Sequence, residues 1–540
     1  MAKKTIYRNI LFLCVATLVA ACARTGYPSG GETDRTPPVI TRVTPENRST
    51  NFSAKGFTLE TDEYVVLKDA NNQVIISPPM KQFPQITSTG KKIKVQIKDT
   101  LLENTTYLFQ FRDAIADFTE GNLLSDFSYV FSTGTVIDSL SFCGTVVDAL
   151  TGDEADKLFV FLYDSFDDSA AMRHPTYITK TDNKGRFRFR YLADKKYKII
   201  ATDDLDKSYT YNSVAERIAF AADTVSPYFM DDSAKPDYMA FQLKAFVQES
   251  AVQRVVKNGF VGKGKVQIAS AVPMVNPTVE TDSVRVFWLL NASRDTLNLW
   301  LMDQNLDSLN LVLRDTSGLD DTLKMRRFAQ RGRIAGNNRF MKANFANTMP
   351  FFDTFCLVFS TPIAKITGAA TAVYYKTSTD SAFAHFVFDS VSRSKVWINI
   401  PVKQGEKYDI TVFGGRFHDI FGTANDTTKY KTEVTTVEKY GNIVIDFQSP
   451  DNGQYIVQLL TDAGKAVAEQ IVAGSGKATF PHLDAGTYRV RAIKDDNANG
   501  KWDPGHYWQN LQPEKVRYFE KNIKVRENWD FEETFKWQQK

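Results

Sequence analysis

The sequence predicts an all-β protein built from several β-sandwich modules in tandem. Its 540 residues are too many for one hydrophobic core, so we expect several domains of about 80–120 residues each. Aromatic residues make up 13% of the chain, and this bias favours strands over helices. Residues 92–98 and 186–191 alternate polar and apolar side chains at the period of two that is typical of a half-buried strand. Few stretches show a helical period.

The chain opens with the pattern of an exported lipoprotein. Three basic residues precede an apolar stretch over residues 10–19, which is too short to span a bilayer comfortably. The stretch ends in Val-Ala-Ala-Cys, which resembles the lipobox that lipoprotein signal peptidase cleaves before the cysteine. We therefore predict a signal peptide over residues 1–21 and acylation of Cys22; the alternative is an ordinary cleaved signal peptide. Acyl chains would hold the protein at a membrane, since each buried methylene adds about 0.8 kcal/mol.

Residues 22–36 predict a flexible tether, because Gly, Ser, Pro and polar residues give them little surface to bury. The residue directly after the cysteine is Ala23, whereas an Asp at this position would resemble an inner-membrane retention signal. We therefore expect an outer-membrane location, on either face of that membrane. The signal peptide carries three of the 66 basic residues and no acid, which leaves 63 basic against 63 acidic residues. This balance does not indicate a nucleic-acid partner.

The first module is predicted over residues 37–135. An Asn-Thr-Thr-Tyr turn leads into a strand on which Tyr107, Phe109 and Phe111 face one side, so these rings are expected between two sheets. The module resembles the bacterial Ig-like domain of the SbsA type, which implies an Ig-like sandwich. The resemblance rests on residues 37–40, 57–60, 64–67, 101–107, 117–122 and 127–133.

Residues 139–227 are predicted to form a second sandwich. Its Gly-Thr-Val-Val-Asp segment and the hairpin turn at 182–185 resemble the carboxypeptidase regulatory-like fold, a small transthyretin-like sandwich without peptidase chemistry. An internal repeat predicts a related sandwich over residues 439–536. Seven residues recur at a constant offset of 291: Leu192 and Leu483, Tyr197 and Tyr488, Ala201 and Ala492, Asp204 and Asp495, Asp206 and Asn497, Tyr211 and Trp502, Asn212 and Asp503.

Two more sandwiches are expected between these modules. Residues 350–434 echo the first module and are predicted to be Ig-like, and residues 236–325 are assigned to a further sandwich from two apolar strand segments. The order of modules, together with the Tyr-Pro-Ser-Gly-Gly tether, resembles an Ig-like-domain lipoprotein family common in Bacteroidota. The resemblance implies location and architecture rather than an activity.

An acidic loop near the C-terminus is the candidate metal site. Asp495, Asn497, Asn499 and Asp503 place oxygen atoms at positions 1, 3, 5 and 9 of a calcium loop, with Gly at position 6. Position 12 is His506, where an EF-hand has Glu, so any calcium binding should be weak. The alternative is a turn in which these side chains cap their own backbone. The parallel loop of the second sandwich lacks the Gly and favours this structural role in both copies.

The candidate ligand-binding residues are Trp502, Tyr507 and Trp508, beside the acidic loop. Exposed aromatic rings stack on sugars, although rings at this spacing are also typical of a core. The five histidines are scattered, and phosphate-loop and nucleophile-elbow motifs are not found, so we expect a non-enzyme that requires no cofactor. The expected function is a scaffold or interaction subunit of a cell-envelope complex, with an envelope protein as partner. The alternative is a surface glycan- or ligand-binding lipoprotein.

Cysteine usage agrees with export. Cys14 leaves with the signal peptide and Cys22 is acylated, so Cys143 and Cys356 remain as thiols. These two lie in different predicted modules and are expected to be buried core residues rather than a disulfide pair.

Overall fold

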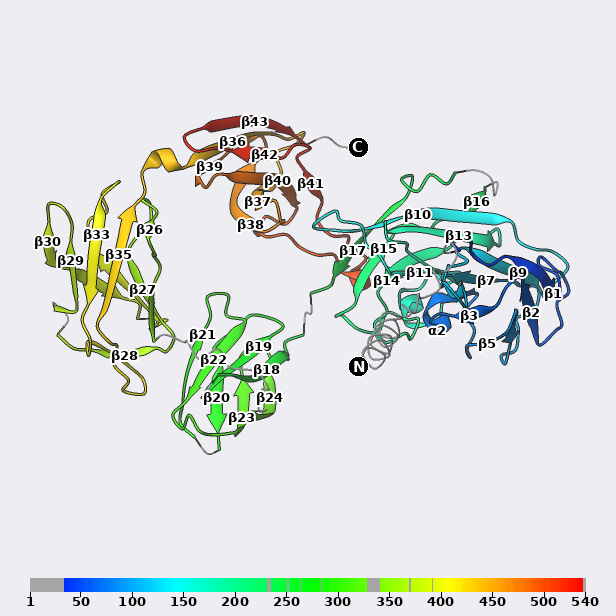
Figure 1. Ribbon diagram of the computed structural model, residues 1–540, viewed down its shortest axis with the longest axis horizontal. Helices are drawn as coiled ribbons and strands as arrows, with labels where there is room; N and C mark the ends of the chain where they lie inside the picture. Colours follow the sequence, from blue (N-terminus) through cyan, green and yellow to red (C-terminus); the bar gives the residue numbers. More distant parts are fainter. Residues whose placement is uncertain are drawn as a thin grey trace, which may run out of the picture.

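The regular secondary structure of the described chain is almost entirely β (Figure 1). The computed structural model describes residues 34–230, 235–249, 252–262, 264–282, 284–327, 340–368, 371–390 and 392–537. Helical segments such as α2 (Ala70–Gln73) are short, and no described helix combines the length and apolar character needed to cross a bilayer. The all-β prediction is therefore confirmed. The predicted signal peptide and Cys22 lie outside the described residues.

The first nine strands form the Ig-like module. Its main sheets have the strand orders β1-β2-β6-β5 and β4-β7-β9, and β3 pairs with β8. Tyr107, Phe109 and Phe111 alternate along β7 and are all buried, as predicted, with Phe57 of β2 edge-on to Phe109 at 5.1 Å between ring centroids. The strands are β1 (Ile40–Thr44), β2 (Gly56–Thr61), β3 (Val65–Leu67), β4 (Ile75–Ser77), β5 (Gln85–Thr89), β6 (Lys92–Gln96), β7 (Thr106–Arg112), β8 (Ile115–Asp117) and β9 (Phe127–Ser132).

The second sandwich has the strand order β12-β11-β14-β15-β17-β10-β13, with β16 paired to β10. It continues past the predicted end at Pro227, because β17 pairs parallel with β10 and antiparallel with β15. Leu243 and Ala245 of β17 are buried in its core. The strands are β10 (Leu140–Asp148), β11 (Phe159–Tyr163), β12 (Tyr177–Lys180), β13 (Arg186–Leu192), β14 (Lys198–Thr202), β15 (Arg217–Phe220), β16 (Tyr228–Phe229) and β17 (Gln242–Val247).

The C-terminal sandwich repeats this pattern of pairings. β36 pairs antiparallel with β39 and parallel with β43, as β10 does with β13 and β17. β37 pairs with β38 and β40, as β11 does with β12 and β14. The residue repeat therefore corresponds to a repeat of strand pairings. The strands are β36 (Gly441–Gln448), β37 (Gln454–Thr461), β38 (Ala466–Ala473), β39 (Gly476–Leu483), β40 (Gly486–Asp495), β41 (Val516–Tyr518), β42 (Ile523–Val525) and β43 (Asp530–Lys536).

The third sandwich has the sheets β18-β19-β22-β21 and β20-β23-β24. Alternating residues of its strands, such as Leu297 and Leu299 on β22, fill the core between the two sheets. Its strands are β18 (Val255–Gly262), β19 (Lys265–Ser270), β20 (Thr278–Thr281), β21 (Val286–Leu290), β22 (Thr296–Leu301), β23 (Ser308–Arg314) and β24 (Asp320–Arg326).

The fourth sandwich has the sheets β25-β27-β32-β31 and β26-β35-β33-β29-β30, and β28 pairs with β34. It begins before the predicted start at residue 350, because β25 pairs with β27 and β26 pairs with β35. Its strands are β25 (Met341–Ala343), β26 (Thr348–Met349), β27 (Cys356–Phe359), β28 (Ile363–Ile366), β29 (Val373–Lys376), β30 (Ser381–Phe383), β31 (His385–Phe388), β32 (Lys395–Asn399), β33 (Lys407–Val412), β34 (Phe417–Asp419) and β35 (Thr428–Val434).

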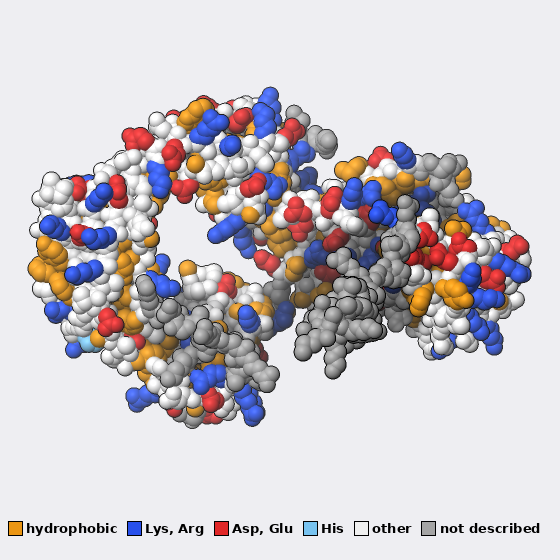
Figure 2. All heavy atoms as spheres, in the orientation of Figure 1, with side chains coloured by type: hydrophobic (Ala, Val, Ile, Leu, Met, Phe, Trp, Pro, Cys, Tyr) orange, Lys and Arg blue, Asp and Glu red, His pale blue; other side chains and the backbone are white. Residues whose placement is uncertain are grey.

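The chain closes on itself as a ring. From the second sandwich it passes through the third and fourth, and the C-terminal sandwich returns to lie beside the second (Figure 1). Figure 2 shows an opening enclosed by these four sandwiches. Hydrogen bonds join the two ends of the circuit, such as the one from Gln512 Nε2 to the Phe220 carbonyl oxygen at 3.0 Å. The Ig-like module lies outside the ring, packed against the second sandwich.

Both thiols of the described chain are buried and free. Cys143 lies on β10 of the second sandwich and is 2% exposed, and Cys356 lies on β27 of the fourth and is 5% exposed. The two are not paired, as the sequence predicts. Cys143 Sγ lies 3.1 Å from the Tyr228 hydroxyl oxygen.

Candidate functional site

One segment that closes the ring is residues 505–513 of the C-terminal sandwich, which we call the hook. It contains the 3-10 turn η4 (Tyr507–Gln509), and His506 and Leu511 pair through their backbones at its base. The hook is an insertion relative to the second sandwich. Asp503 and Glu514 are separated by 11 positions, whereas Asn212 and Glu216, which hold corresponding places in the earlier copy, are separated by four.

Tyr507 anchors the hook in the second sandwich and is 5% exposed. Its ring packs edge-on against Phe220 of β15 and lies 6.0 Å from the ring of Tyr211. Its backbone N–H donates to Gln248 Oε1 at 2.9 Å, and its hydroxyl donates to the Asp168 carbonyl oxygen at 3.4 Å. The residue therefore makes both apolar and polar contacts across the module boundary.

The three predicted ligand-binding aromatics do not form one exposed platform. Tyr507 is buried at the module boundary, and Trp502 is half-buried with its Nε1–H donating to the Glu514 carbonyl oxygen at 3.2 Å. Of the three, Trp508 exposes the most, at 39%, beside the rings of Tyr507 and Tyr211. Ligand binding at these residues stays a prediction, and Trp508 offers its available ring.

The predicted calcium loop folds around Asp495, which is buried at the end of β40. Its carboxylate accepts hydrogen bonds from the backbone N–H groups of Asn499 and Gly500, at 3.1 and 2.8 Å. The Asp503 carboxylate accepts from the side-chain amides of Asn497 and Asn499. The four predicted ligands are thus brought together in one turn. Both the calcium hypothesis and the turn-capping hypothesis require this arrangement.

Glu514 completes this loop and was missed by the sequence reasoning. Its carboxylate accepts from the backbone N–H groups of Asp496 and Asp503, at 2.8 and 3.0 Å. Burial raises the pKa of Glu514, and the nearby Asp503 and Asp495 add to the rise. A buried acid therefore lies beside the loop. It comes eight residues after His506, the position at which an EF-hand has its glutamate.

The corresponding loop of the second sandwich folds in the same way. The Asp204 carboxylate accepts from the backbone N–H groups of Ser208 and Tyr209, at 3.0 and 3.2 Å, which matches the two bonds to Asp495 at the same offset of 291. Tyr209 has φ of 54° where the later copy has Gly500 with φ of 79°. The absent glycine therefore does not prevent the loop conformation, because tyrosine adopts the left-handed region there.

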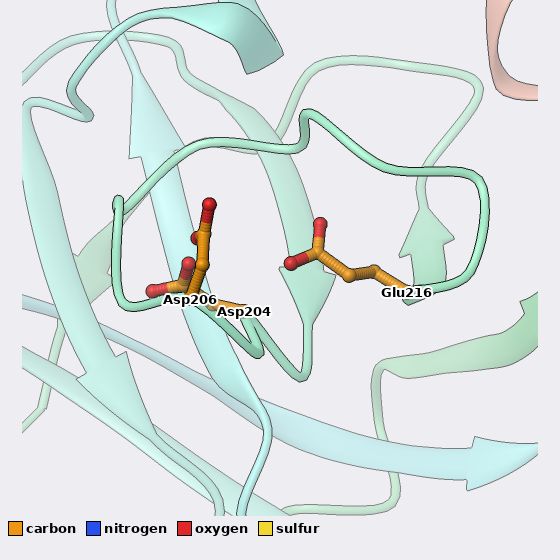
Figure 3. Close-up of side chains that lie close together, drawn as sticks. All are labelled: Asp204, Asp206 and Glu216. Atoms are coloured by element: carbon orange, nitrogen blue, oxygen red, sulfur yellow. The ribbon is translucent and has the colours of Figure 1, made fainter.

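Three carboxyl groups meet in this second-sandwich loop: Asp204, Asp206 and Glu216 (Figure 3). Burial raises the pKa of Asp204 to about 6, and the facing Glu216 adds to the rise. Hydrogen bonds from the Asn212 and Ser208 side chains lower the pKa of the exposed Asp206 to about 2. Burial also raises the pKa of Glu216. Such an acidic group could hold a metal ion through oxygen atoms.

A signal for the two glutamates does exist in the sequence. Glu216 stands directly before the apolar strand β15, and Glu514 stands two residues before β41. An acid at the entrance of a buried strand such as β15 is uncommon without a partner, whereas β41 is only partly buried and gives a weaker signal. The sequence gives no distance between these acids and the loops, so only the fold shows that they meet.

A cleft of about 500 Å³ lies between the Ig-like module and the second sandwich. One wall is apolar and contains Ile75 and Met80, and the other contains the Asp204 loop. Four basic residues also line it: Lys157, Lys180, Lys207 and Arg217. Burial lowers the pKa of Lys180, and its basic neighbours Arg112, Lys207 and Lys157 add to the fall.

Comparison with known proteins identifies the first module. Residues 34–133 match the family of the bacterial Ig-like domain, so this module is a bacterial Ig-like domain at the head of a chain of tandem Ig-like β-sandwiches. No curated protein matches the chain.

Solved structures similar to the chain show low identity. They include SGBP-B of the mixed-linkage glucan utilization locus of Bacteroides ovatus, in complex with a heptasaccharide, at 11% identity over 72% of this chain and 94% of that one (TM-score 0.18). BcpA, the major pilin subunit of Bacillus cereus, is similar at 10% identity over 73% of this chain and 99% of that one (TM-score 0.15). Domains 1–6 of the surface layer protein SbsC are similar at 10% identity, over 91% and 67% (TM-score 0.13). Likeness at these TM-scores carries no argument about function.

Proposed function

We propose that this chain is a non-catalytic, lipid-anchored outer-membrane protein that serves as a scaffold or interaction subunit of a cell-envelope complex. The observation that carries the proposal is the closure of the ring through Tyr507. Sandwiches joined only by linkers move relative to one another, because contacts between domains of one chain are usually small. A closed ring instead presents its outer edges in a fixed arrangement, which suits a protein that positions others.

An exposed outer edge of the fourth sandwich favours the proposal of a protein partner. β30 is the last strand of its sheet and all three of its residues are exposed. Phe383 on this strand is 49% exposed and lies beside Tyr374 and Phe413. Figure 2 shows hydrophobic side chains gathered on this edge of the ring. An edge strand with exposed aromatic rings can pair with an extended segment of an envelope protein.

The anchor in this proposal is Cys22, supported by the lipobox-like Val-Ala-Ala-Cys and by Ala23 after it. The finer family assignment belongs to the same proposal. The Ig-like module would be of the SbsA type, and the chain would belong with the Ig-like lipoproteins of Bacteroidota that it resembles. Sequence resemblance and the order of modules support this assignment.

The anchor is tested by fractionation. The wild-type chain should sediment with outer membranes and incorporate labelled fatty acid, and Cys22→Ser should lose the label and move to the soluble fraction. A Cys22→Ser variant that keeps its fatty-acid label would refute anchoring at this residue.

The scaffold role is tested by affinity purification of the full chain from gently solubilised membranes. We expect a stoichiometric envelope protein, and we expect Phe383→Lys to reduce its recovery because a charge would meet the partner strand. The matched control is Phe118→Lys, at an exposed phenylalanine of the Ig-like module. Purification of the chain alone after crosslinking of intact cells would count against the scaffold.

The alternative function, glycan binding, would use the exposed ring of Trp508. A glycan-array signal that disappears in Trp508→Ala, without a stoichiometric protein partner, would favour it over the scaffold. Because Tyr507 is buried at the module boundary, its substitution is not a clean test of glycan contact.

A further inference from the structure

The Asp204 loop brings three carboxyl groups together. The ligand oxygens of Asp204, Asp206 and Glu216 all lie within 4.8 Å of one another. Asp204 and Glu216 are almost completely buried. Within the described chain none of the three forms an ion pair, and the adjacent Arg217 pairs with Asp203 instead. Like charges at this spacing repel, so a bound cation or proton would stabilise the folded loop.

Glu216 shows where a ligand is missing. Its Oε1 accepts from the Leu205 backbone N–H at 2.9 Å, but its Oε2 is buried with no hydrogen-bond partner among the described residues. The Asn212 backbone N–H is near enough to lower the pKa of Glu216. It makes no hydrogen bond of ordinary geometry to Glu216 Oε2. Figure 3 shows the carboxylate directed toward Asp204 and Asp206. An unpartnered buried carboxylate oxygen is costly, and a bound cation would satisfy it.

We propose that Asp204, Asp206 and Glu216 bind a divalent cation of the calcium type. Neutral oxygen atoms of the same loop are available to complete the site. They come from the Ser208 hydroxyl, the Thr210 carbonyl and the Asn212 side chain, which are already linked by hydrogen bonds within the loop.

The ligand set favours calcium over other cations. From Asp204 onward the oxygens fall at positions 1, 3, 5, 7 and 9, the spacing of a calcium loop, and Glu216 follows at position 13. The cluster contains neither histidine nor cysteine, the ligands typical of zinc. Several oxygens on an irregular loop suit the variable coordination of calcium better than the strict octahedron of magnesium.

The proposal concerns the second sandwich and not the C-terminal loop. There, both oxygens of Glu514 accept backbone hydrogen bonds, and Asn497 replaces the second aspartate. Asp503 in turn replaces Asn212, so the C-terminal loop does not lack a carboxylate. What distinguishes the earlier loop is the buried Glu216 oxygen, which has no hydrogen-bond partner among the described residues. Calcium at the loop of Asp495 remains the separate prediction made from sequence.

The first test is calcium titration by isothermal calorimetry of the full chain in detergent, after removal of metal with EDTA. We expect binding with a dissociation constant on the order of 10⁻⁴ to 10⁻³ M, as in extracellular calcium modules. Glu216→Gln should weaken calcium binding by about tenfold or more, and so should Asp206→Asn, which changes an exposed residue and leaves the core intact. Loss of a residue that only hydrogen-bonds to a metal ligand already costs about 10–100-fold in affinity. Asp223→Asn, at an exposed acid of the same sandwich, is the matched control and should bind as the wild type does.

Glu514→Gln separates the two loops. Heat of binding that persists in Glu216→Gln and Asp206→Asn but disappears in Glu514→Gln would place the ion in the C-terminal loop and overturn the proposal. The absence of any calcium heat in the wild-type chain would overturn it as well.

Thermal unfolding distinguishes a metal ligand from a purely structural glutamate. In EDTA, Glu216→Gln should unfold at a temperature no lower than the wild type, because it removes an unpaired buried charge. In saturating calcium it should unfold at a lower temperature than the wild type, since only the wild type gains stability from the bound ion. An equal loss of stability in both conditions would refute the proposal.

Discussion

The Tyr507 ring packs edge-on against Phe220, with 5.3 Å between the ring centroids and an interplanar angle of 86°. Tyr507 belongs to the C-terminal sandwich and Phe220 to the second, which are the last and first sandwiches of the ring in chain order. Lys198 adds a cation–π contact to the Tyr507 ring at 5.1 Å. A buried aromatic side chain thus contributes to the contact between the last sandwich and the second, and edge-to-face geometry of this kind is a favourable arrangement for two rings.

Tyr507→Ala should open the ring. Removal of a buried aromatic side chain costs about 3–5 kcal/mol, and here the cost falls on the contact between two sandwiches rather than on either core. We expect the radius of gyration measured by small-angle X-ray scattering to increase while the far-UV spectrum stays that of β-sheet. Trp529→Ala, at a 53% exposed tryptophan of the C-terminal sandwich, is the control. An unchanged radius of gyration would show that Tyr507 does not hold the ring closed.

Gly505→Ala should weaken the same contact by one methyl group. A Cβ at this position would lie 2.4 Å from the Leu511 carbonyl oxygen and 2.7 Å from Cζ of Phe246. The first neighbour is backbone of the hook and the second belongs to the second sandwich. Both the hook and the surface that it packs against would therefore have to move. We expect faster proteolysis within residues 505–513 than in the wild type. Gly486→Ala serves as the control for added bulk, since a Cβ built there would lie no closer than 3.7 Å to its nearest neighbour, Cε2 of Tyr488. Equal rates in the two variants would contradict this account.

Local patterns predicted the strands, and their limits explain what was missed. The period of two placed Phe109 and Phe111 in the core correctly, and the repeat at an offset of 291 matched equivalent loops around Asp204 and Asp495. These features depend on neighbouring residues. β17 was assigned to the wrong module because its parallel pairing with β10 joins segments about 100 residues apart, and no local signal marks such pairing.

The candidate sites show the same division between local and distant information. The loop residues were found from spacing, whereas Glu216 and Glu514 reach the loops only through the fold. Tyr507 was recognised as notable, but its spacing fits a core residue and a ligand platform equally well. Its partner Phe220 lies in another sandwich, and the sequence alone does not bring the two together.

Ser77→Ala should loosen the Ig-like module from the second sandwich. Ser77 Oγ accepts from the backbone N–H of Ile178 at 3.1 Å, and both residues are buried where β4 meets the edge strand β12. Loss of the acceptor leaves a buried N–H unpaired, at a cost of about 1–3 kcal/mol. We expect faster hydrogen exchange at the Ile178 amide. The exposed Ser53→Ala is the control, and unchanged exchange in Ser77→Ala would show that another group takes over the bond.

Removal of calcium should loosen the ring if the proposed cation site is occupied. Tyr211 lies inside the Asp204 loop and contacts the rings of Tyr507 and Trp508. An ion that orders the loop therefore also orders the surface against which the hook packs. Binding that orders a shared element couples the two sites reciprocally. Chelation should therefore increase the radius of gyration of the wild type but leave that of Glu216→Gln unchanged. A calcium-binding chain whose radius does not respond to chelation would show that the two sites are not coupled.

Asp204→Asn should remove a pH dependence from the metal-free second sandwich. Burial raises the pKa of Asp204 from 3.8 to about 6, and Glu216 and Asp206 face it, while Arg217 is paired with Asp203. The folded chain then binds the proton more tightly than the unfolded chain, so the free energy of unfolding should fall as the pH rises from about 4 to about 6, by up to about 3 kcal/mol.

The local stability of β14 and β15, followed by hydrogen exchange in EDTA at several pH values, checks this expectation. The wild type and the control Asp223→Asn should lose protection across that pH range, whereas Asp204→Asn should lose much less because its amide carries no titrating proton. In saturating calcium the wild type should also lose less, since the cation stabilises the ionised carboxylates. Equal pH dependence of the wild type and Asp204→Asn in EDTA would mean that the Asp204 carboxyl group keeps an ordinary pKa despite its burial.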